Sequence, residues 1–168
     1  IIARHEPSRP ILLAHSAVSP LIQICAQPRK YPSVVLGYAA ATLANLGLNL
    51  GCADEMIREG AIDPLLSLLS LEASEGGAVD EVLIGYSAAA LRNLAGHDTY
   101  RPHLVEAEAA RALLEICKAE CQQLRRETEQ PGSVPDEIRV GSVGISNVLL
   151  ALANIARAEQ TADSLMIE

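Results

Sequence analysis

Three asparagines occupy the same position in a recurring apolar sequence, close to its end. They are Asn45 in "GYAAATLANLGL", Asn93 in "GYSAAALRNLAG" and Asn154 in "SNVLLALANIAR". An amide can donate and accept hydrogen bonds at the same time. A row of amides can therefore hold the backbone of an extended peptide, whatever its side chains, or bond to the ends of neighbouring helices. The spacing is compatible with both roles.

The residues that share a helix face with these asparagines are the other candidates for binding a partner. In a helix, positions four and seven residues earlier lie on the same stripe. The positions seven residues earlier are Tyr38, Tyr86 and Asn147, and Arg92 directly precedes Asn93. We therefore predict a partner-binding face formed by Asn45, Asn93, Asn154, Tyr38, Tyr86, Asn147 and Arg92. The two tyrosines suit this face, although tyrosines also pack against helices with their hydroxyls at the surface.

Cys117 and Cys121 lie four residues apart, a spacing that could present two thiolates to zinc from one helix. Zinc would need two more ligands, and His97 and His103 in the preceding segment show no paired spacing. We therefore expect two buried thiols and no metal. The four cysteines of the chain fall among helix-forming residues, unlike those of a small disulfide-stapled secreted domain. We expect all of them to be reduced.

The motifs of common enzyme active sites are missing from the sequence. It contains no glycine-rich phosphate loop, no nucleophile elbow, and no serine or cysteine with a histidine and an acid at a recognisable spacing. Many carboxylates fall at predicted helix starts, where they favour the positive end of the helix dipole. We predict a protein without enzymatic activity and without a cofactor.

Composition and charge favour an all-helical protein and disfavour several classes of partner. Apolar residues make up 49% of the chain and aromatic residues 2%, so the core must be built from Leu, Ala, Ile and Val. The net charge is −8 and the basic residues are scattered, which argues against nucleic-acid binding and suits a basic partner. No run reaches the roughly 18 apolar residues of a membrane span. We expect a cytoplasmic or nuclear protein.

The segment before each asparagine helix recurs as well. "MIREGAIDPLLSLL" matches "LVEAEAARALLEIC" at a shift of 48 residues and "LLAHSAVSPLIQIC" at a shift of 44. The unit reads as a short helix ending near Gly60, a second helix entered through Asp63 and Pro64, a variable turn and the asparagine helix. Asp before Pro suits a helix start, because Asp can cap free N–H groups and Pro lacks one. A fixed unit of this kind predicts a stack of repeats.

These linked blocks resemble the armadillo repeat, most closely at "REGAIDPLLSLL" joined to "GYSAAALRNLAG". The resemblance implies an all-α, right-handed solenoid of three-helix repeats, whose third helices line a concave groove that carries the asparagines. Importin-type armadillo proteins have tryptophan four residues before the asparagine. This chain has Ala41, Ala89 and Leu150 there and contains no tryptophan.

The repeat pattern predicts how the chain is organised. We expect a partial repeat over 1–11, repeats over 12–51, 52–99 and 100–157, and a partial repeat over 158–168. The third full repeat carries an inserted loop over 122–137, which is charged and contains Pro and Gly. Both ends then fall inside a repeat, as in a piece cut from a longer array, and such ends can self-associate.

The resemblance predicts a noncatalytic scaffold that binds a partner protein or extended peptide on the concave surface of the third helices. One alternative is a small-GTPase-binding armadillo regulator, an exchange factor or chaperone-like protein, because such regulators are similar in lacking the groove tryptophans and in having long turns before the third helix. Another is a supporting helical module within a larger chaperone or signalling protein. The sequence on either side of this segment would distinguish the three.

Overall fold

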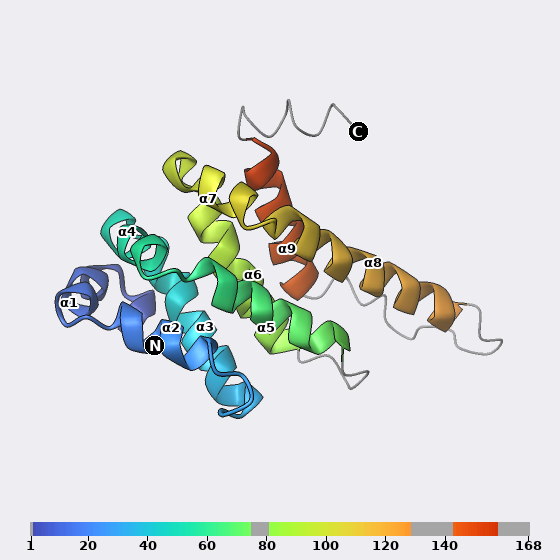
Figure 1. Cartoon of the computed structure of the whole chain (residues 1–168), viewed down its shortest axis with the longest axis horizontal. Coiled ribbons are helices and arrows are strands. Elements are labelled where there is room, and N and C mark those ends of the chain that lie inside the picture. Colours follow the sequence, from blue (N-terminus) through green and yellow to red (C-terminus); the bar gives the residue numbers. More distant parts are fainter. Residues whose placement is uncertain (1, 75–80, 129–142, 158–168) are drawn as a thin grey trace.

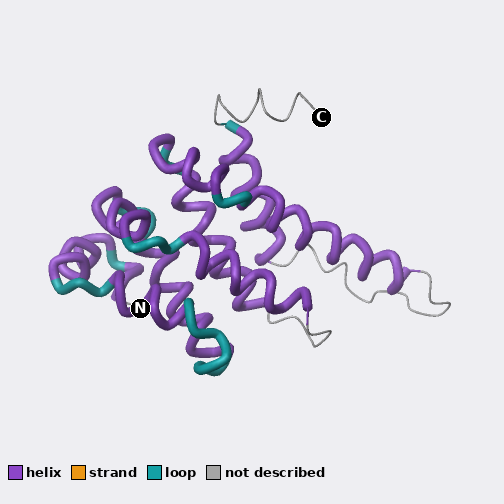
Figure 2. Tube along the Cα trace, viewed as in Figure 1, coloured by secondary structure: helices purple, strands orange, loops and turns teal. Residues whose placement is uncertain are grey.

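The computed structural model consists of helices joined by short turns, and it describes residues 2–74, 81–128 and 143–157 (Figures 1 and 2). All regular secondary structure in these ranges is helical, which confirms the all-α prediction. The α-helices are α1 (Arg9–Ala14), α2 (Val18–Cys25), α3 (Ser33–Leu46), α4 (Leu50–Arg58), α5 (Ile62–Ser74), α6 (Glu81–Ala95), α7 (Arg101–Glu106), α8 (Ala109–Thr128) and α9 (Val143–Ala156). Short 3₁₀ turns are η1 (Ile2–Arg4), η2 (Glu6–Ser8) and η3 (Asp98–Tyr100).

The helices are arranged in rows, in which every third helix along the chain is a neighbour in space. Helix α6 packs between α3 and α9, α5 packs between α2 and α8, and α1 packs on α4 (Figure 1). The two longer rows also pack on each other, since α2 contacts α3, α5 contacts α6 and α8 contacts α9. Within the described ranges, no helix combines the length and hydropathy that crossing a membrane requires.

One turn geometry occurs three times among the described residues. Ser16, Gly60 and Glu108 adopt positive φ angles of 52°, 69° and 52°, and they lie 44 and 48 residues apart. Each follows a short helix and precedes the next one, the position at which a left-handed residue closes a helix C-terminus. Main-chain bonds close the first two turns, from Ala17 to Leu12 at 3.0 Å and from Ala61 to Met56 at 2.9 Å. The spacings equal the shifts that align the sequence.

Two arginines repeat another contact. The Arg9 Nε–H donates to the Ala3 carbonyl at 3.1 Å, and the Arg101 Nε–H donates to the Ala95 carbonyl at 2.9 Å. Arg101 is buried and also pairs with Asp98 at 2.6 Å. Its guanidinium satisfies a carbonyl at the last residue of α6, where a helix leaves its carbonyls without intrahelical partners. Both bonds span six residues, but the sequence alignment did not single them out.

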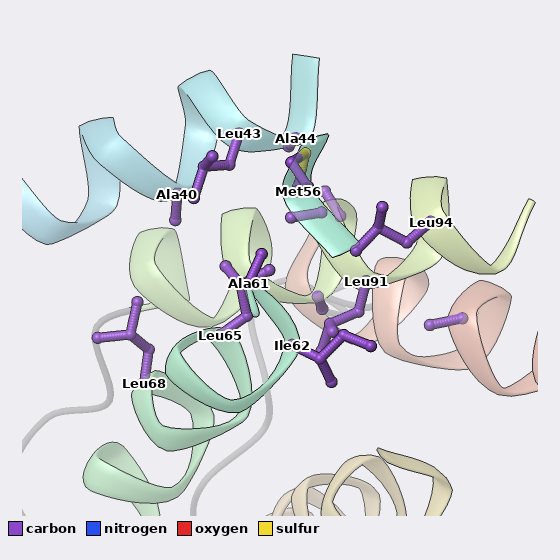
Figure 3. Packing of buried hydrophobic residues seen from close by; sticks show 14 of the residues in the cluster. Ala40, Leu43, Ala44, Met56, Ala61, Ile62, Leu65, Leu68, Leu91 and Leu94 are labelled. Atoms are coloured by element: carbon purple, nitrogen blue, oxygen red, sulfur yellow. The ribbon is translucent and has the colours of Figure 1, made fainter. Parts of the chain in front are cut away.

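Small residues let the long helices of the α3, α6 and α9 row approach closely. A Cβ atom placed on Gly85 of α6 would lie 3.6 Å from the Gly144 backbone of α9. Ala40 in α3 and Ala88 in α6 are fully buried. Leucines from the adjacent row fill the space behind them, and Figure 3 shows side chains of α3, α4, α5 and α6 meeting in this core.

The inserted loop begins later than the sequence predicted. Residues 122–128, expected in the loop over 122–137, continue α8 as far as Thr128. This part of the prediction is wrong because Gln, Leu, Arg and Glu are good helix formers and no breaker precedes Pro131 and Gly132. Residues 129–137 lie outside the described ranges, as does the partial repeat expected over 158–168.

Ser87 of α6 provides a test of this packing. Its side chain is fully buried, and its hydroxyl has no hydrogen-bond partner among the described residues. We expect Ser87→Ala to leave the free energy of unfolding unchanged or to raise it by about 1 kcal/mol, because an unsatisfied hydroxyl leaves the core.

The control for this change is Ala39→Ser, at the equivalent position of α3, where the side chain is also buried. It should lower the free energy of unfolding by about 1 kcal/mol. Urea unfolding followed by circular dichroism measures both variants. A Ser87→Ala protein that loses more than about 1 kcal/mol would show that the hydroxyl is bonded in the native protein.

Candidate functional site

The outward stripe of α3, α6 and α9 carries most of the predicted binding residues. We call it the third-helix face, and it consists of Val34, Tyr38, Asn45, Leu48, Val82, Tyr86, Asn93, Leu150 and Asn154. Apolar side chains are unusually exposed here: Tyr38 is 69% exposed, Val82 58% and Tyr86 40%. Helical spacing places each of them on the stripe of the asparagines.

The third-helix face is almost free of charge, although the chain carries a net charge of −8. The sequences of α3 and α9 contain no Asp, Glu, Lys or Arg, and that of α6 contains Glu81 at its first position and Arg92 near its end. Apart from Glu81, the acidic residues within the described ranges therefore lie outside α3, α6 and α9. A basic partner remains a prediction, but this face offers it few carboxylates.

Asn93 joins α6 to α3, and Asn154 joins α9 to α6. The Asn93 amide donates to the Ala44 carbonyl of α3 at 2.7 Å, and the Asn154 amide donates to the Arg92 carbonyl of α6 at 3.2 Å. In both cases the acceptor carbonyl belongs to the residue just before an asparagine of the neighbouring helix, since Ala44 is followed by Asn45 and Arg92 by Asn93. The geometry therefore places these two amides in the role of joining helix ends, one of the two roles that the sequence left open. Each amide keeps a second N–H group, while the Asn93 oxygen accepts hydrogen bonds from the Arg92 guanidinium.

The other two predicted asparagines differ from this pair. Asn45 is half-buried and donates to the Ala41 carbonyl of its own helix at 2.7 Å. Asn147 is only 7% exposed and donates to the Gly85 carbonyl of α6 at 3.0 Å. Asn147 therefore lies between α6 and α9, below the surface that a partner would contact.

Arg92 connects two of these asparagines through its guanidinium group. Nε and Nη2 donate to Asn93 Oδ1 at 3.1 and 3.0 Å, and Nη1 donates to Asn147 Oδ1 at 2.6 Å. The side chain is half-buried and is held across α6 and α9. Both acceptors are neutral amide oxygens, so these bonds fix the cation without neutralising it.

A shallow hollow lies where the C-terminal ends of α3, α6 and α9 meet. Its volume is about 250 Å³, and its lining residues are Leu48, Arg92, Asn93, Gly96, His97, Leu150 and Asn154. The structure thus brings three predicted residues into one site, whereas Tyr38, Tyr86, Asn45 and Asn147 are not among its lining residues.

Sequence reasoning missed His97, Leu48 and Gly96 as lining residues of this hollow, whereas it placed Leu150 on the asparagine stripe without naming it as a binding residue. The His97 Nε2–H donates to the Gly47 carbonyl at 3.0 Å, beside the carbonyl that Asn93 bonds. The repeat alignment contains a signal for two of them, because Leu48 and Gly96 each follow an asparagine by three residues, about one helical turn.

The cysteines are free thiols in different surroundings. Cys25 and Cys52 are buried, and burial raises the pKa of Cys25 to about 11 and also raises the pKa of Cys52. Cys117 is half-buried and Cys121 is exposed, so the expectation of two buried thiols is wrong for Cys121. Cys121 lies on the same stripe of α8 as Cys117, one turn further along, where this stripe faces solvent.

Other groups with metal-binding or acid–base potential serve the fold. The described residues contain no group of three or more His, Cys, Asp or Glu side chains placed to hold a metal ion. Tyr100 is buried and donates its hydroxyl to Asp54 of α4. Burial, followed by the bond to this carboxylate, raises the pKa of Tyr100 to about 12. This tyrosine therefore stays neutral at physiological pH and ties η3 to α4.

Comparison with protein-family models, with curated proteins and with solved structures gave no significant match for this chain. Its function is therefore inferred from the geometry of the third-helix face and from the resemblance in its sequence.

The asparagine bonds predict different stability effects at equivalent positions. Asn93→Ala removes the donor for the Ala44 carbonyl and the oxygen that holds Arg92, and we expect it to lower the free energy of unfolding by about 1–3 kcal/mol. Asn45→Ala removes a bond within its own helix and should lower it by less than about 0.5 kcal/mol. Urea unfolding measures both. Equal losses would show that the interhelical bond does not stabilise the protein.

Thiol exposure predicts an order of chemical modification. At pH 8 we expect a maleimide reagent to label Cys121 first, because it is exposed, and to label Cys25 and Cys52 only after denaturant is added, because both are buried and have raised pKa values. Peptide mass spectrometry over a time course identifies the labelled residues. Labelling of Cys25 in the native protein as fast as that of Cys121 would contradict the described core.

Proposed function

We propose that this chain is a segment of an armadillo-type, right-handed α-solenoid that acts as a noncatalytic scaffold and binds an extended segment of a partner protein on the third-helix face. Three repeated details support the armadillo-type unit. They are the left-handed turns 44 and 48 residues apart, the matching arginine–carbonyl bonds, and the two asparagine amides that reach the preceding third helix. The free cysteines fit a reducing compartment such as the cytosol or nucleus.

The row of exposed apolar side chains is the observation that carries the binding role. Val34 and Tyr38 on α3, Val82 and Tyr86 on α6, and Leu150 on α9 are all at least 40% exposed. Contiguous exposed apolar groups of this kind mark interaction surfaces, and tyrosine is enriched at the residues that contribute most to binding. Because the row crosses three helices, it suits a partner segment long enough to contact each of them.

The polar groups of the face suit a role in alignment. The Asn93 and Asn154 amides each spend one donor on a helix carbonyl and retain one N–H for the backbone of a bound segment. Apolar contact with the tyrosines would then supply most of the affinity, and the amides would set the register.

Selection from a library of displayed random 12-residue peptides tests this proposal, with binding of selected peptides then measured by fluorescence polarisation. We expect a Tyr38→Ala/Tyr86→Ala variant to bind them at least about tenfold more weakly, because removing an aromatic anchor from a binding surface typically weakens binding by about 1–3 kcal/mol. Both tyrosines are exposed, so the melting temperature should change little.

The matched control is an Ile11→Ala/Leu114→Ala variant, which removes two exposed apolar side chains from α1 and α8. It should bind the same peptides with unchanged affinity. Failure to select any peptide that depends on Tyr38 and Tyr86, or equal losses in the control variant, would contradict binding on the third-helix face.

A further inference from the structure

We propose that the hollow at the C-terminal ends of α3, α6 and α9 is a carboxylate-binding site, in which the Arg92 guanidinium holds an acidic side chain or the terminal carboxylate of the bound polypeptide. This inference rests on the proposed function, and it assigns one anionic group to a defined place in the partner segment. It also separates this hollow from the apolar remainder of the third-helix face.

The charge of Arg92 is not balanced by a carboxylate in the described part of the chain. The ion pairs found there join Arg58 to Glu55, Arg101 to Asp98, Arg111 to Glu108 and Lys118 to Glu115, and each lies within one local segment. Arg92 instead bonds the amide oxygens of Asn93 and Asn147. Neutral partners leave the charge of this half-buried cation available to an anion.

The guanidinium is also held in position for a ligand. It has five N–H donors, and three bonds to the two amide oxygens use three of them. Two donors remain for an anion in the hollow, which Arg92 lines. Because Arg92 is already fixed, binding costs little of the side-chain entropy that a free arginine would lose.

The lining of the hollow favours an anion over other ligands. Leu48 and Leu150 provide apolar walls, which strengthen an ion pair by limiting its contact with water. The other side chains of the lining are the amides of Asn93 and Asn154 and the imidazole of His97, so none is a carboxylate that would compete for Arg92. The anionic group of an unmodified polypeptide is a carboxylate, which matches the planar guanidinium.

The distance to the tyrosines limits where this carboxylate lies in a bound segment. Tyr86 and Arg92 are six residues apart in α6, or about 9 Å along the axis at about 1.5 Å per residue. An extended peptide advances about 3.3 Å per residue. Where the bound segment follows α6 between these two side chains, the carboxylate should therefore lie about three residues from the apolar side chain that contacts Tyr86.

A direct test uses small carboxylates and the whole chain. The side-chain Nε–H resonance of Arg92, assigned with Arg92→Lys, is followed by NMR during titration with N-acetyl-glutamate methylamide, a side-chain carboxylate, and with N-acetyl-leucine, a terminal carboxylate. We expect a saturable shift in the millimolar range for at least one of them. The stronger binder identifies the source. N-acetyl-glutamine methylamide, at matched salt, should cause no such shift.

This titration does not depend on peptide selection, so it separates the two proposals. No shift of the Arg92 resonance, or the same shift with the glutamine compound, overturns the carboxylate site even if selected peptides bind through Tyr38 and Tyr86. A saturable shift together with failed peptide selection would retain the anion site and reject the proposed function.

Selected peptides give a second, independent measurement by a double-mutant cycle. Changing the peptide Glu to Gln, or amidating its C-terminus, should weaken binding to the wild-type protein about tenfold and to Arg92→Gln less than about twofold. Arg111→Gln removes the same charge from an exposed ion pair and should retain the full peptide effect. Equal peptide effects in all three proteins, or selected peptides without a carboxylate, overturn the proposal.

Loss of the bonds to Asn93 and Asn147 can affect folding, so melting temperatures are compared before binding. If Arg92→Gln does not fold, Arg92→Lys replaces it in the cycle, because lysine keeps the charge but not the planar fork. The peptide effect should then fall at least about threefold from its wild-type value. An unchanged effect with Arg92→Lys would show that the guanidinium does not hold the carboxylate.

Discussion

The end of an α-helix leaves its last carbonyls without intrahelical partners, and this constraint explains how the third helices are joined. At the end of α3, Asn93 and His97 donate to the Ala44 and Gly47 carbonyls. At the end of α6, Asn154 and Arg101 donate to the Arg92 and Ala95 carbonyls. Each helix is thus completed by side chains that come later in the chain. The contacts that pack these helices side by side therefore also supply hydrogen-bond donors to their C-terminal carbonyls.

In this arrangement, some residues of the third-helix face join the helices and others form the contact surface. Because the Asn93 and Asn154 amides donate to helix carbonyls, exposed tyrosine, valine and leucine side chains form the main contact surface. Arg92 belongs to both parts. It is fixed by Asn93 and Asn147, and it lines the hollow with two N–H donors that these bonds do not use. A mutation of Arg92 is therefore expected to change both stability and affinity, and both have to be measured.

The sequence predicted what repeats in this chain, but it did not predict which residues lie opposite one another. Leucine and alanine content gave the all-α class, and Gly60 marked the turn that also occurs at Ser16 and Glu108. The partners of Asn93 and Asn154 depend on how two distant helices are staggered, which one sequence does not specify. For the same reason His97 did not stand out as a neighbour of Asn93. Helix α8 passed the expected loop boundary because local propensity continues to Thr128.

The two interfaces of this row differ in the ends at which they are bonded. Helices α6 and α9 are bonded near one end by Asn154 and near the other by Asn147, which reaches the Gly85 carbonyl. Between α3 and α6, the bonds of Asn93 and His97 both lie at the C-terminal end, and the position equivalent to Asn147 is the exposed Tyr86. Bonds at both ends fix the angle between two helices, whereas bonds at one end leave the other end to side-chain packing. Polar bonds therefore constrain the angle between α3 and α6 less than the angle between α6 and α9, on the side where both exposed tyrosines lie.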